Sequence, residues 1–307
     1  MAKTAFIFPG QGAQYVGMAK DFYDGIDECR AVIDEADALM DFDLKKIMFD
    51  ENDLINKTEY TQAAMLAAEI CILKAVELKG IKADITAGLS LGEYAALVAC
   101  GSLSFGDAMK LVRKRGIYME NEVPAGQGTM AAVIGLDAPT VERLCAEIEE
   151  KTGKPVSAAN YNCPGQIVIS GAKEAVGEAV APLKEAGAKL VSMLNVSGPF
   201  HSPMLKGAGD KLAKELEGAE FAKPAIPYIN NVAAETVTDS EHIKETLERQ
   251  VYSPVRWQQT MEKMLADGVD TFYEIGPGKT LAGFMKRIDR SMKVITVNTV
   301  EDLEAHL

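Results

Sequence analysis

The sequence contains no apolar run close to the roughly 20 residues that a membrane-spanning helix needs. At the N-terminus, MAKTAFIFPGQG has too short an apolar stretch for a secretory signal peptide. With 48% hydrophobic and 25% charged residues, the composition is that of an ordinary globular protein. We therefore expect a cytoplasmic protein that has no membrane partner.

Cysteine pairs at metal-binding or redox spacing are also missing. The five cysteines are odd in number, scattered and without CxxC spacing: Cys29, Cys71, Cys100, Cys145 and Cys163. This pattern argues against a disulfide framework and against a zinc site. We expect reduced cysteines in the core and no metal.

Positive charge is scarce, because 32 Lys and Arg face 45 Asp and Glu, for a net charge of −13. General nucleic-acid binding is therefore not expected, since a phosphate backbone needs a cationic footprint. No GK[ST] phosphate loop occurs, and Tyr15 stands where a third glycine would have to follow Gly10 and Gly12 in G-x-G-x-x-G. We expect no nucleotide cofactor.

The order of hydrophobic patterns predicts an α/β protein. Residues 5–10, AFIFPG, predict a buried strand that leads into a loop, and residues 61–78 carry helix formers at helical spacing. Residues 83–100 predict a strand, a glycine turn and a helix, and residues 107–123 predict another helix. The 307-residue length exceeds a typical domain of about 100 to 200 residues, which favours one large core plus a smaller subdomain.

A different order of elements begins near residue 127. Strand, helix, two strands, helix and strand follow one another up to residue 197, which is the ferredoxin-like βαββαβ plan. We therefore expect an inserted ferredoxin-like subdomain at 127–197. Residues 1–126 and 198–307 are expected to form a discontinuous, α/β-hydrolase-like large domain with a parallel sheet.

A candidate nucleophile lies in Gly88-Leu89-Ser90-Leu91-Gly92, which matches G-x-S-x-G between a predicted strand and a predicted helix. In a nucleophile elbow the serine is held in a strained conformation at a helix N-terminus, where the Leu91 amide can stabilise an oxyanion. The alternative is a helix entry at which Ser90 only caps the first turn.

A serine nucleophile needs a neighbouring base, most often a histidine. Three histidines are available: His306 is the penultimate residue, and His242 lies in DSEHIKE, a polar stretch typical of a solvated helix start. His201 remains, in the Gly/Pro-punctuated segment VSGPFHSPM. A lone histidine is more often structural, but the elbow requires a partner, which favours His201 as the base.

Six motifs, in one order along the chain, resemble those of bacterial malonyl-CoA:acyl carrier protein transacylases. They are FPGQGAQ at 8–14, GLSLGEY at 88–94, RKRG at 113–116, GPFH at 198–201, RQVYSPVRW at 249–257 and EIGPGK at 274–279. The resemblance extends over nearly the whole chain, and the family's fold also has an inserted ferredoxin-like subdomain.

The resemblance implies roles for five residues. Ser90 would be the nucleophile and His201 the base, with Gln250 in place of a triad carboxylate as the acceptor that orients His201. Gln11 and Leu91 would supply the oxyanion-hole amides. Gln11 lies in a predicted tight turn at the carboxyl end of a strand, where exposed amides collect. Without the resemblance, an ordinary turn is the simpler interpretation.

Arg115 matches the family's arginine that pairs with the free carboxylate of the malonyl group. A planar guanidinium binds a carboxylate through two parallel hydrogen bonds, which disfavours acyl groups that lack the charge. Spacing alone does not select it, because Arg113 and Lys114 are adjacent and a cationic run is usually a solvated helix face.

Other residues are expected near the acyl group. Met119, one helical turn after Arg115, is a candidate for the pocket wall or for plain core. Phe200 resembles the aromatic residue that crowds out a methyl branch in malonyl-selective members. Asn160 and Asn162 fall where the family has asparagines near the site, although such segments are commonly turns. Leu89 departs from the family, which usually has histidine there.

A cationic stretch lies near the C-terminus, in GFMKRIDRSMK, with Lys286, Arg287, Arg290 and Lys293. On an acidic protein it could dock an acidic carrier protein, since opposite charge steers encounter. The alternative is a set of cations that complement a helix dipole.

The predicted function is transfer of a malonyl group from malonyl-CoA to Ser90 and then to acyl carrier protein, for fatty acid or polyketide synthesis. We also expect the enzyme to be a monomer. The alternatives are a serine thioesterase or esterase with the same elbow and a noncatalytic carrier-protein-binding subunit. Hydrolases of this fold usually place an acid between the serine and a late histidine. A noncatalytic subunit leaves Ser90 and His201 unexplained.

Overall fold

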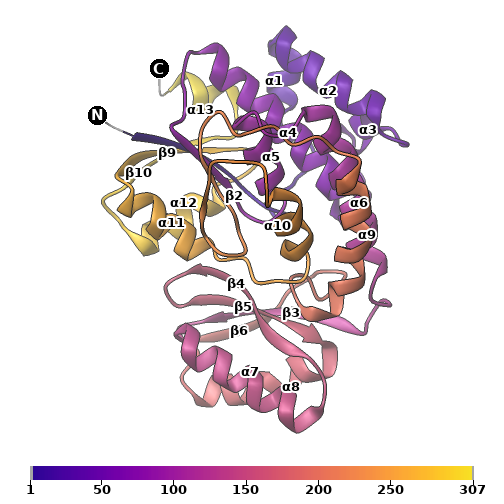
Figure 1. Ribbon diagram of the computed structural model, residues 1–307, viewed down its shortest axis with the longest axis vertical. Helices are drawn as coiled ribbons and strands as arrows, with labels where there is room; N and C mark the ends of the chain where they lie inside the picture. The colour runs from indigo at the N-terminus through magenta and orange to yellow at the C-terminus, as the bar shows by residue number, and fades with distance from the viewer. Residues whose placement is uncertain (1–2, 306–307) are drawn as a thin grey trace.

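The computed structural model describes residues 3–305 and has two sheets (Figure 1). The larger sheet has six strands in the order β10-β9-β1-β2-β7-β8. Its strands are β1 Lys3–Phe8, β2 Ile85–Gly88, β7 Tyr228–Ile229, β8 Thr236–Val237, β9 Val269–Ile275 and β10 Lys293–Val297. Neighbours are parallel except for β7 and β8. The central strands β1 and β2 therefore end side by side, which brings their following loops to one edge.

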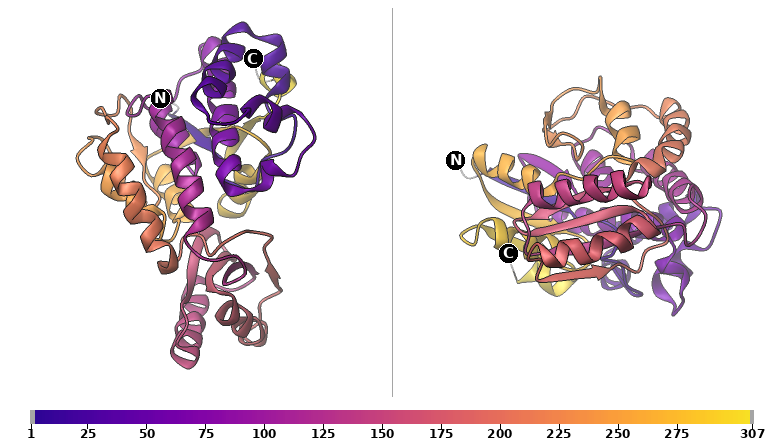
Figure 2. Two further views of the ribbon diagram at one scale, coloured as in Figure 1. Left: turned by 90° about the vertical axis from the view of Figure 1, so that its right-hand side faces the viewer. Right: turned by 90° about the horizontal axis from the view of Figure 1, so that it is seen from below.

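The smaller sheet is antiparallel, in the order β4-β5-β3-β6, and lies below the larger one in Figure 1. Its elements are β3 Gly128–Ile134, α7 Ala138–Thr152, β4 Val156–Cys163, β5 Gln166–Ala172, α8 Lys173–Glu185 and β6 Leu190–Met193. Figure 2 shows α7 and α8 side by side across one face of this sheet. This is the predicted βαββαβ order, and all six elements fall within residues 127–197. The α/β fold class with a parallel sheet and a ferredoxin-like insert is confirmed.

The remaining helices pack around the larger sheet. They are α1 Lys20–Gly25, α2 Asp27–Leu39, α3 Leu44–Phe49, α4 Thr58–Leu78, α5 Gly92–Ala99, α6 Phe105–Asn121, α9 Lys206–Glu217, α10 Ile243–Gln250, α11 Trp257–Ala266, α12 Thr280–Ile288 and α13 Val300–Glu304, with 3₁₀ turns η1 Leu54–Asn56 and η2 Pro203–Leu205. No helix between residues 3 and 305 combines the length and apolarity needed to cross a bilayer.

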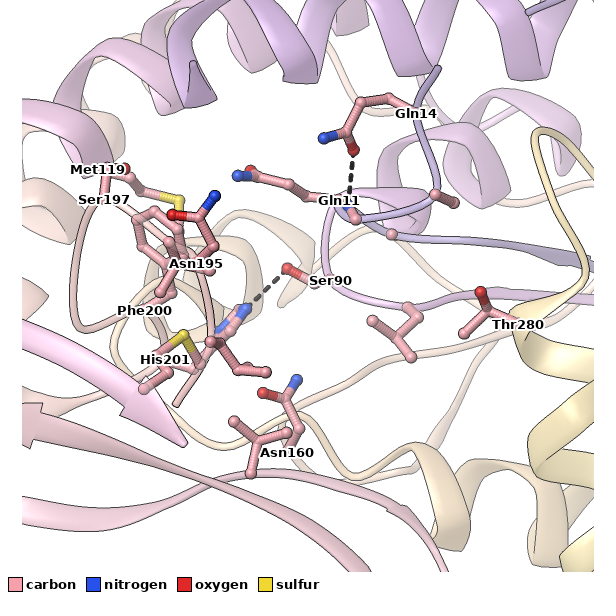
Figure 3. Close-up of a pocket in the computed structure, with 18 of the residues that line it drawn as sticks. Gln11, Gln14, Ser90, Met119, Asn160, Asn195, Ser197, Phe200, His201 and Thr280 are labelled. Atoms are coloured by element: carbon pink, nitrogen blue, oxygen red, sulfur yellow. Dashed lines mark hydrogen bonds between the residues drawn. The ribbon is translucent and has the colours of Figure 1, made fainter. Parts of the chain in front are cut away.

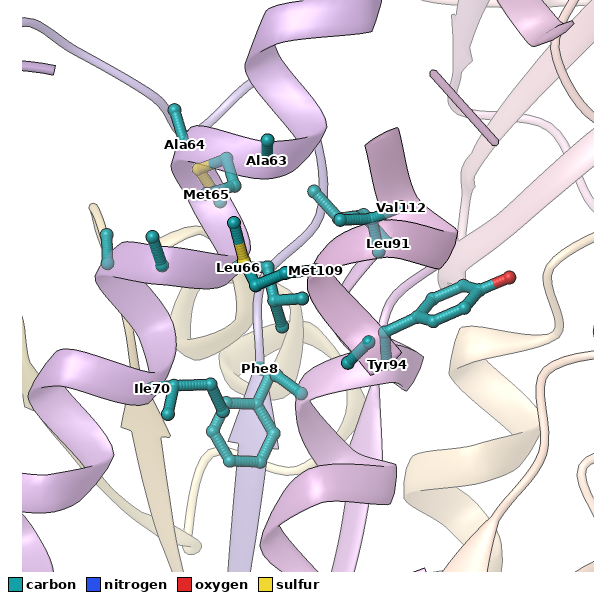
Figure 4. Close-up of a cluster of buried hydrophobic side chains, with 14 of the residues drawn as sticks. Phe8, Ala63, Ala64, Met65, Leu66, Ile70, Leu91, Tyr94, Met109 and Val112 are labelled. Carbon is teal, nitrogen blue, oxygen red and sulfur yellow. The ribbon is translucent and has the colours of Figure 1, made fainter. Parts of the chain in front are cut away.

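Helix α4 is central to the core, and most of its residues are buried. Its small residues Ala63 and Ala64 are fully buried, and Leu66 and Ile70 pack in the same cluster as Phe8 of β1 (Figure 4). Alanine at such positions lets neighbouring helices approach closely while it favours the helix. This packing supports α5 and α6, which carry the residues of the candidate site.

Two helix starts differ from the predicted ones. Helix α6 begins at Phe105 rather than at 107, because the Ser104 side chain accepts a hydrogen bond from the Asp107 amide at 3.1 Å and caps the first turn. Helix α4 begins at Thr58 rather than at 61. The apolar period identified both helices, whereas the exact first residue depends on local contacts that the period does not encode.

Candidate active site

Ser90 lies on a sharp turn between β2 and α5. Its φ of 55° is in the left-handed region, which is costly for a residue with a side chain. The turn is tight because glycines flank it: a Cβ on Gly88 would lie 1.9 Å from the backbone of Gly92, and a Cβ on Gly92 would lie 2.4 Å from the carbonyl oxygen of Phe8. The local geometry is therefore that of the predicted elbow.

Gly88→Ala is expected to destabilise the fold by more than about 3 kcal/mol, because its Cβ would overlap backbone atoms that cannot move independently. The midpoint of chemical denaturation measures this loss. Gly177→Ala is the matched control: Gly177 lies inside α8 and has no atom within 4 Å of a built Cβ, so alanine should stabilise slightly. Equal stabilities of the two variants would contradict the close approach.

Asn231 holds the turn from the other side. Its Oδ1 accepts a hydrogen bond from the Ser90 amide at 2.6 Å, and its Nδ2 donates to the Gly88 carbonyl at 2.7 Å. The side chain is fully buried, just after the short strand β7, which pairs with β2. Asn231 was not among the predicted site residues. The signal for it in the sequence is a polar pair, Asn230-Asn231, at the end of an apolar segment.

The Ser90 hydroxyl meets the His201 imidazole across the fold. The Oγ to Nε2 distance is 2.7 Å, and both residues are buried (Figure 3). The other ring nitrogen, Nδ1, lies 2.8 Å from the carbonyl oxygen of Gln250. Because a carbonyl only accepts, Nδ1 carries the proton, which leaves Nε2 as an acceptor for the Ser90 proton. This is the geometry of a serine with a general base.

The electrostatic surroundings keep His201 neutral. Burial and the nearby positive charge of Arg115 lower the pKa of His201 from 6.5 to about 4. The imidazole is therefore unprotonated at neutral pH, the state that can accept a proton. Of the other histidines, His242 is exposed at the start of α10, and His306 lies outside the described residues.

Gln250 touches His201 through its main chain, not through its side chain. The side-chain Nε2 donates to the Ser90 carbonyl at 2.9 Å and to Glu93 Oε2 at 2.7 Å, while Oε1 accepts from Arg115 Nη2 at 2.9 Å. The predicted acceptor is thus present, but a backbone carbonyl replaces the triad carboxylate. The buried side chain joins the arginine to the elbow.

The structure distinguishes Arg115 from its cationic neighbours. Arg115 is buried, with Nη2 3.1 Å from Ser90 Oγ and Nη1 2.8 Å from Gln62 Oε1. Arg113 instead pairs with the carboxylates of Asp41 and Glu59. Gln62 was not predicted, because it lies in an apolar stretch of α4 that the sequence marks only as core.

A cavity of about 510 Å³ opens onto Ser90 and His201. Its lining includes the predicted residues Arg115, Met119, Asn160, Asn162 and Phe200, and also Met130, Val168 and Leu194. Both asparagines are nearly buried on strand β4 rather than in a turn. Residues of the small sheet and of the large domain therefore face the same cavity, which suits an acyl group with an extended carrier arm.

The two predicted oxyanion-hole residues flank the nucleophile differently. Gln11 lines the cavity, and the turn after it is tied by a 2.7 Å hydrogen bond from the Gly12 amide to Gln14 Oε1 (Figure 3). Leu91 precedes the first residue of α5, and its side chain is buried in the core, so only its amide can face a substrate. Within residues 3–305, neither amide donates to a protein acceptor. Both are available to an oxyanion.

The cationic residues follow the part of α12 that lines the cavity. Lys286 and Arg287 are exposed in the last turn of α12, and Phe284 of the same helix lines the cavity. Arg290 and Lys293 are exposed just beyond. Among the ion pairs of the described chain, none involves these four cations. In the same part of the chain, no cluster of three or more His, Cys, Asp or Glu side chains is arranged to hold a metal ion.

Comparisons with known proteins find relatives over nearly the whole chain. The acyl transferase domain family matches residues 5–302. The malonyl CoA-acyl carrier protein transacylase of Bacillus subtilis is 45% identical over 305 residues, which cover 99% of this chain and 96% of that protein. An acyl carrier protein S-malonyltransferase from Vibrio cholerae superposes with a TM-score of 0.96 at 43% identity, covering 100% of both chains.

A third relative was solved with a partner. It is a malonyl-transacylase in complex with a type II PKS acyl-carrier protein, with a TM-score of 0.96 and 41% identity, covering 100% of this chain and 99% of that chain. The chain therefore belongs to the malonyl-CoA:acyl carrier protein transacylase family of acyl transferase domains.

Proposed function

We propose that this protein transfers a malonyl group from malonyl-CoA to the phosphopantetheine thiol of an acyl carrier protein, through a malonyl ester of Ser90. The observation that carries the proposal is the position of the Ser90 hydroxyl. It lies 2.7 Å from the neutral imidazole of His201 and 3.1 Å from the buried guanidinium of Arg115. A nucleophile, its base and a cation for a carboxylate thus converge on one cavity.

In the first half-reaction, His201 Nε2 takes the Ser90 proton while Oγ attacks the malonyl thioester carbon. The resulting oxyanion accepts hydrogen bonds from the Gln11 and Leu91 amides. When the tetrahedral intermediate collapses, the carbon–sulfur bond breaks, and His201 returns the proton to the coenzyme A sulfur. The product is malonyl-Ser90 and free coenzyme A, with neutral His201 restored.

In the second half-reaction, the carrier protein's thiol enters the same cavity. His201 takes the thiol proton, the sulfur attacks the ester carbon, and the second intermediate collapses with the proton returned to Ser90 Oγ. The kinetics are expected to be ping-pong. Since one chain supplies every residue named for these steps, the site needs no second subunit, and we expect the enzyme to act as a monomer. The free, buried cysteines fit a location in the cytoplasm.

Selectivity for malonyl is assigned to Arg115 and Phe200. The guanidinium is the one cation we place at the acyl group, and a buried carboxylate–arginine pair is favourable only when both partners are present. The Phe200 ring lines the cavity next to His201 and would collide with a branched acyl group. Asn160, Asn162 and Met119 complete the wall.

The test is an assay with labelled malonyl-CoA that separates transfer from hydrolysis. With holo carrier protein, we expect malonyl carrier protein as the main product. Without it, we expect one equivalent of enzyme-bound label and slow release of free malonate. Fast malonate release that the carrier protein does not suppress would identify a thioesterase instead.

Carrier docking is assigned to the exposed cations at the end of α12 and just beyond it, Lys286, Arg287 and Arg290. Arg287→Glu combined with Lys286→Glu should raise the KM for carrier protein by about tenfold or more at low salt, because like charges replace attraction. Loading from malonyl-CoA without carrier should change little. Steady-state kinetics at low and high ionic strength measure the effect, which salt should weaken. The same reversal at Lys79 and Lys82 is the control; an equal effect there would contradict a defined docking surface.

A further inference from the structure

Glu93 is a buried carboxylate to which the proposed mechanism gives no role. It lies in the first turn of α5, three residues after the nucleophile, and is fully buried. Its Oε2 accepts hydrogen bonds from Gln250 Nε2 at 2.7 Å and from the Asn231 amide at 3.2 Å. Its Oε1 has no hydrogen-bond partner within residues 3–305. A carboxylate in this position needs a compensating positive charge.

The positive charge that acts on Glu93 belongs to Arg115, which is itself a buried cation without a carboxylate partner among the described residues. Its guanidinium is buried, and among residues 3–305 it donates only to neutral groups, on Gln62, Ser90 and Gln250. In the described chain no carboxylate oxygen lies within 4.0 Å of its nitrogens. A direct ion pair would occupy the arginine, whereas neutral partners leave it free for a substrate carboxylate.

One amide connects the two charges. Gln250 accepts from Arg115 with its Oε1 and donates to Glu93 with its Nε2, so its dipole is aligned between cation and anion. We propose that Glu93 is the counter-ion of Arg115, acting through Gln250, and is a positioning residue that competes with the malonyl carboxylate for the guanidinium. This inference rests on the proposed function.

The counter-ion role predicts whether a substitution of Glu93 strengthens or weakens malonyl binding. If the Glu93 charge is removed while its hydrogen bonds remain, Arg115 should hold the malonyl carboxylate more tightly. Acetyl has no carboxylate and should not respond. The carboxylate stays bound to Arg115 in both the ground state and the transition state, so KM for malonyl should fall without a rise in kcat.

Protonation of Glu93 should affect malonyl binding in the same way as removal of its charge by substitution. Burial raises the pKa of Glu93 to about 7, against the opposing effects of Gln250, the Asn231 amide and Arg115. Lowering the pH through about 7 therefore protonates Glu93 and removes its charge. The other groups facing it, the hydroxyls of Tyr94 and Tyr228, stay neutral because burial raises the pKa of each. His201 titrates well below this range.

The experiment compares Glu93→Gln with the unaltered enzyme, using malonyl-CoA and acetyl-CoA as donors between pH 6 and 8. Acetyl-CoA corrects for the coenzyme A phosphate, which titrates near pH 6 in both donors. Glu274→Gln is the matched control: Glu274 is also fully buried with a pKa raised to about 7, but it accepts from the Leu281 and Ala282 amides.

We expect Glu93→Gln to lower the malonyl-CoA KM by about fivefold relative to acetyl-CoA, as loss of a nearby buried charge implies. The unaltered enzyme should show the same relative fall from pH 8 to 6, the variant should show none, and Glu274→Gln should keep it. Equal changes for both donors, or a raised malonyl KM, would overturn the proposal.

Two results separate this inference from the proposed function. If the unaltered enzyme loads no malonyl, the proposed function fails. If it loads malonyl but the malonyl-to-acetyl ratio does not depend on pH or on Glu93, only the counter-ion role fails. Should Glu93→Gln not fold, the pH dependence of that ratio in the unaltered enzyme decides alone.

Discussion

Ser90→Ala is expected to lower malonyl transfer by at least about 10³-fold, because among residues 3–305 the Ser90 hydroxyl is the one that is hydrogen-bonded to the His201 base. The 2.7 Å contact with His201 Nε2 is lost with the hydroxyl, so the base has no proton to accept. Steady-state transfer to holo carrier protein measures the loss. The fold should survive, since alanine removes only the hydroxyl oxygen. The main-chain amide of residue 90 can still donate its hydrogen bond to Asn231 Oδ1.

Ser202→Ala is the matched control for this prediction. Ser202 is also buried, but its hydroxyl donates to the Pro199 carbonyl at 2.7 Å and faces no base. It should cost about 1 kcal/mol of stability and leave transfer within a few fold. Similar activity losses in the two variants would mean that Ser90 acts through folding rather than as the nucleophile.

Arg115→Ala is expected to lower kcat/KM for malonyl-CoA by about 10²-fold or more and to affect acetyl-CoA far less. Removing one partner of a buried, hydrogen-bonded charge pair costs about 3–5 kcal/mol, and only malonyl carries the second charge. Competition between the two donors in one reaction measures the ratio directly, so any loss of active enzyme cancels.

Arg113→Ala provides the comparison for this arginine. It removes the same side chain two positions earlier on α6, but Arg113 pairs with Asp41 and Glu59 rather than with the nucleophile. The malonyl-to-acetyl ratio should not change in this variant. An equal fall for both donors in Arg115→Ala would rule out a carboxylate clamp.

The sequence predicted the pair at the centre of the site because few residues could serve. G-x-S-x-G between a strand and a helix identifies the turn, and only three histidines compete for the base. Arg115 could not be separated from Arg113 by spacing. The structure separates them because the helix turns one side chain inward and the other toward Asp41.

The residues that sequence analysis missed all act over long separations. Asn231 accepts a hydrogen bond from the Ser90 amide across 141 positions, and Glu93, which had no predicted role, accepts one from Gln250 across 157. Their local sequence marks them only weakly, since an asparagine pair after a strand resembles a turn and a glutamate after an elbow resembles a solvated helix residue. Such contacts depend on the order of strands in the sheet, which local patterns do not encode.

The elements of the fold also divide into those that the sequence predicted and those that it did not. The long periodic segments, α4, α6 and the βαββαβ insert, were predicted in type and order, with ends shifted by a few residues. Strands β7 and β8, with two residues each, carry too short a pattern to predict. They matter because β7 lies beside β2 and brings Asn231 to the elbow.

Mapping of the acyl adduct tests the central claim most directly. The enzyme is incubated with malonyl-CoA without carrier protein, quenched in acid, digested and analysed by mass spectrometry. We predict one malonyl group on the peptide that contains Ser90, and no adduct in Ser90→Ala. A malonyl group on another residue, or one that persists in Ser90→Ala, would contradict the account.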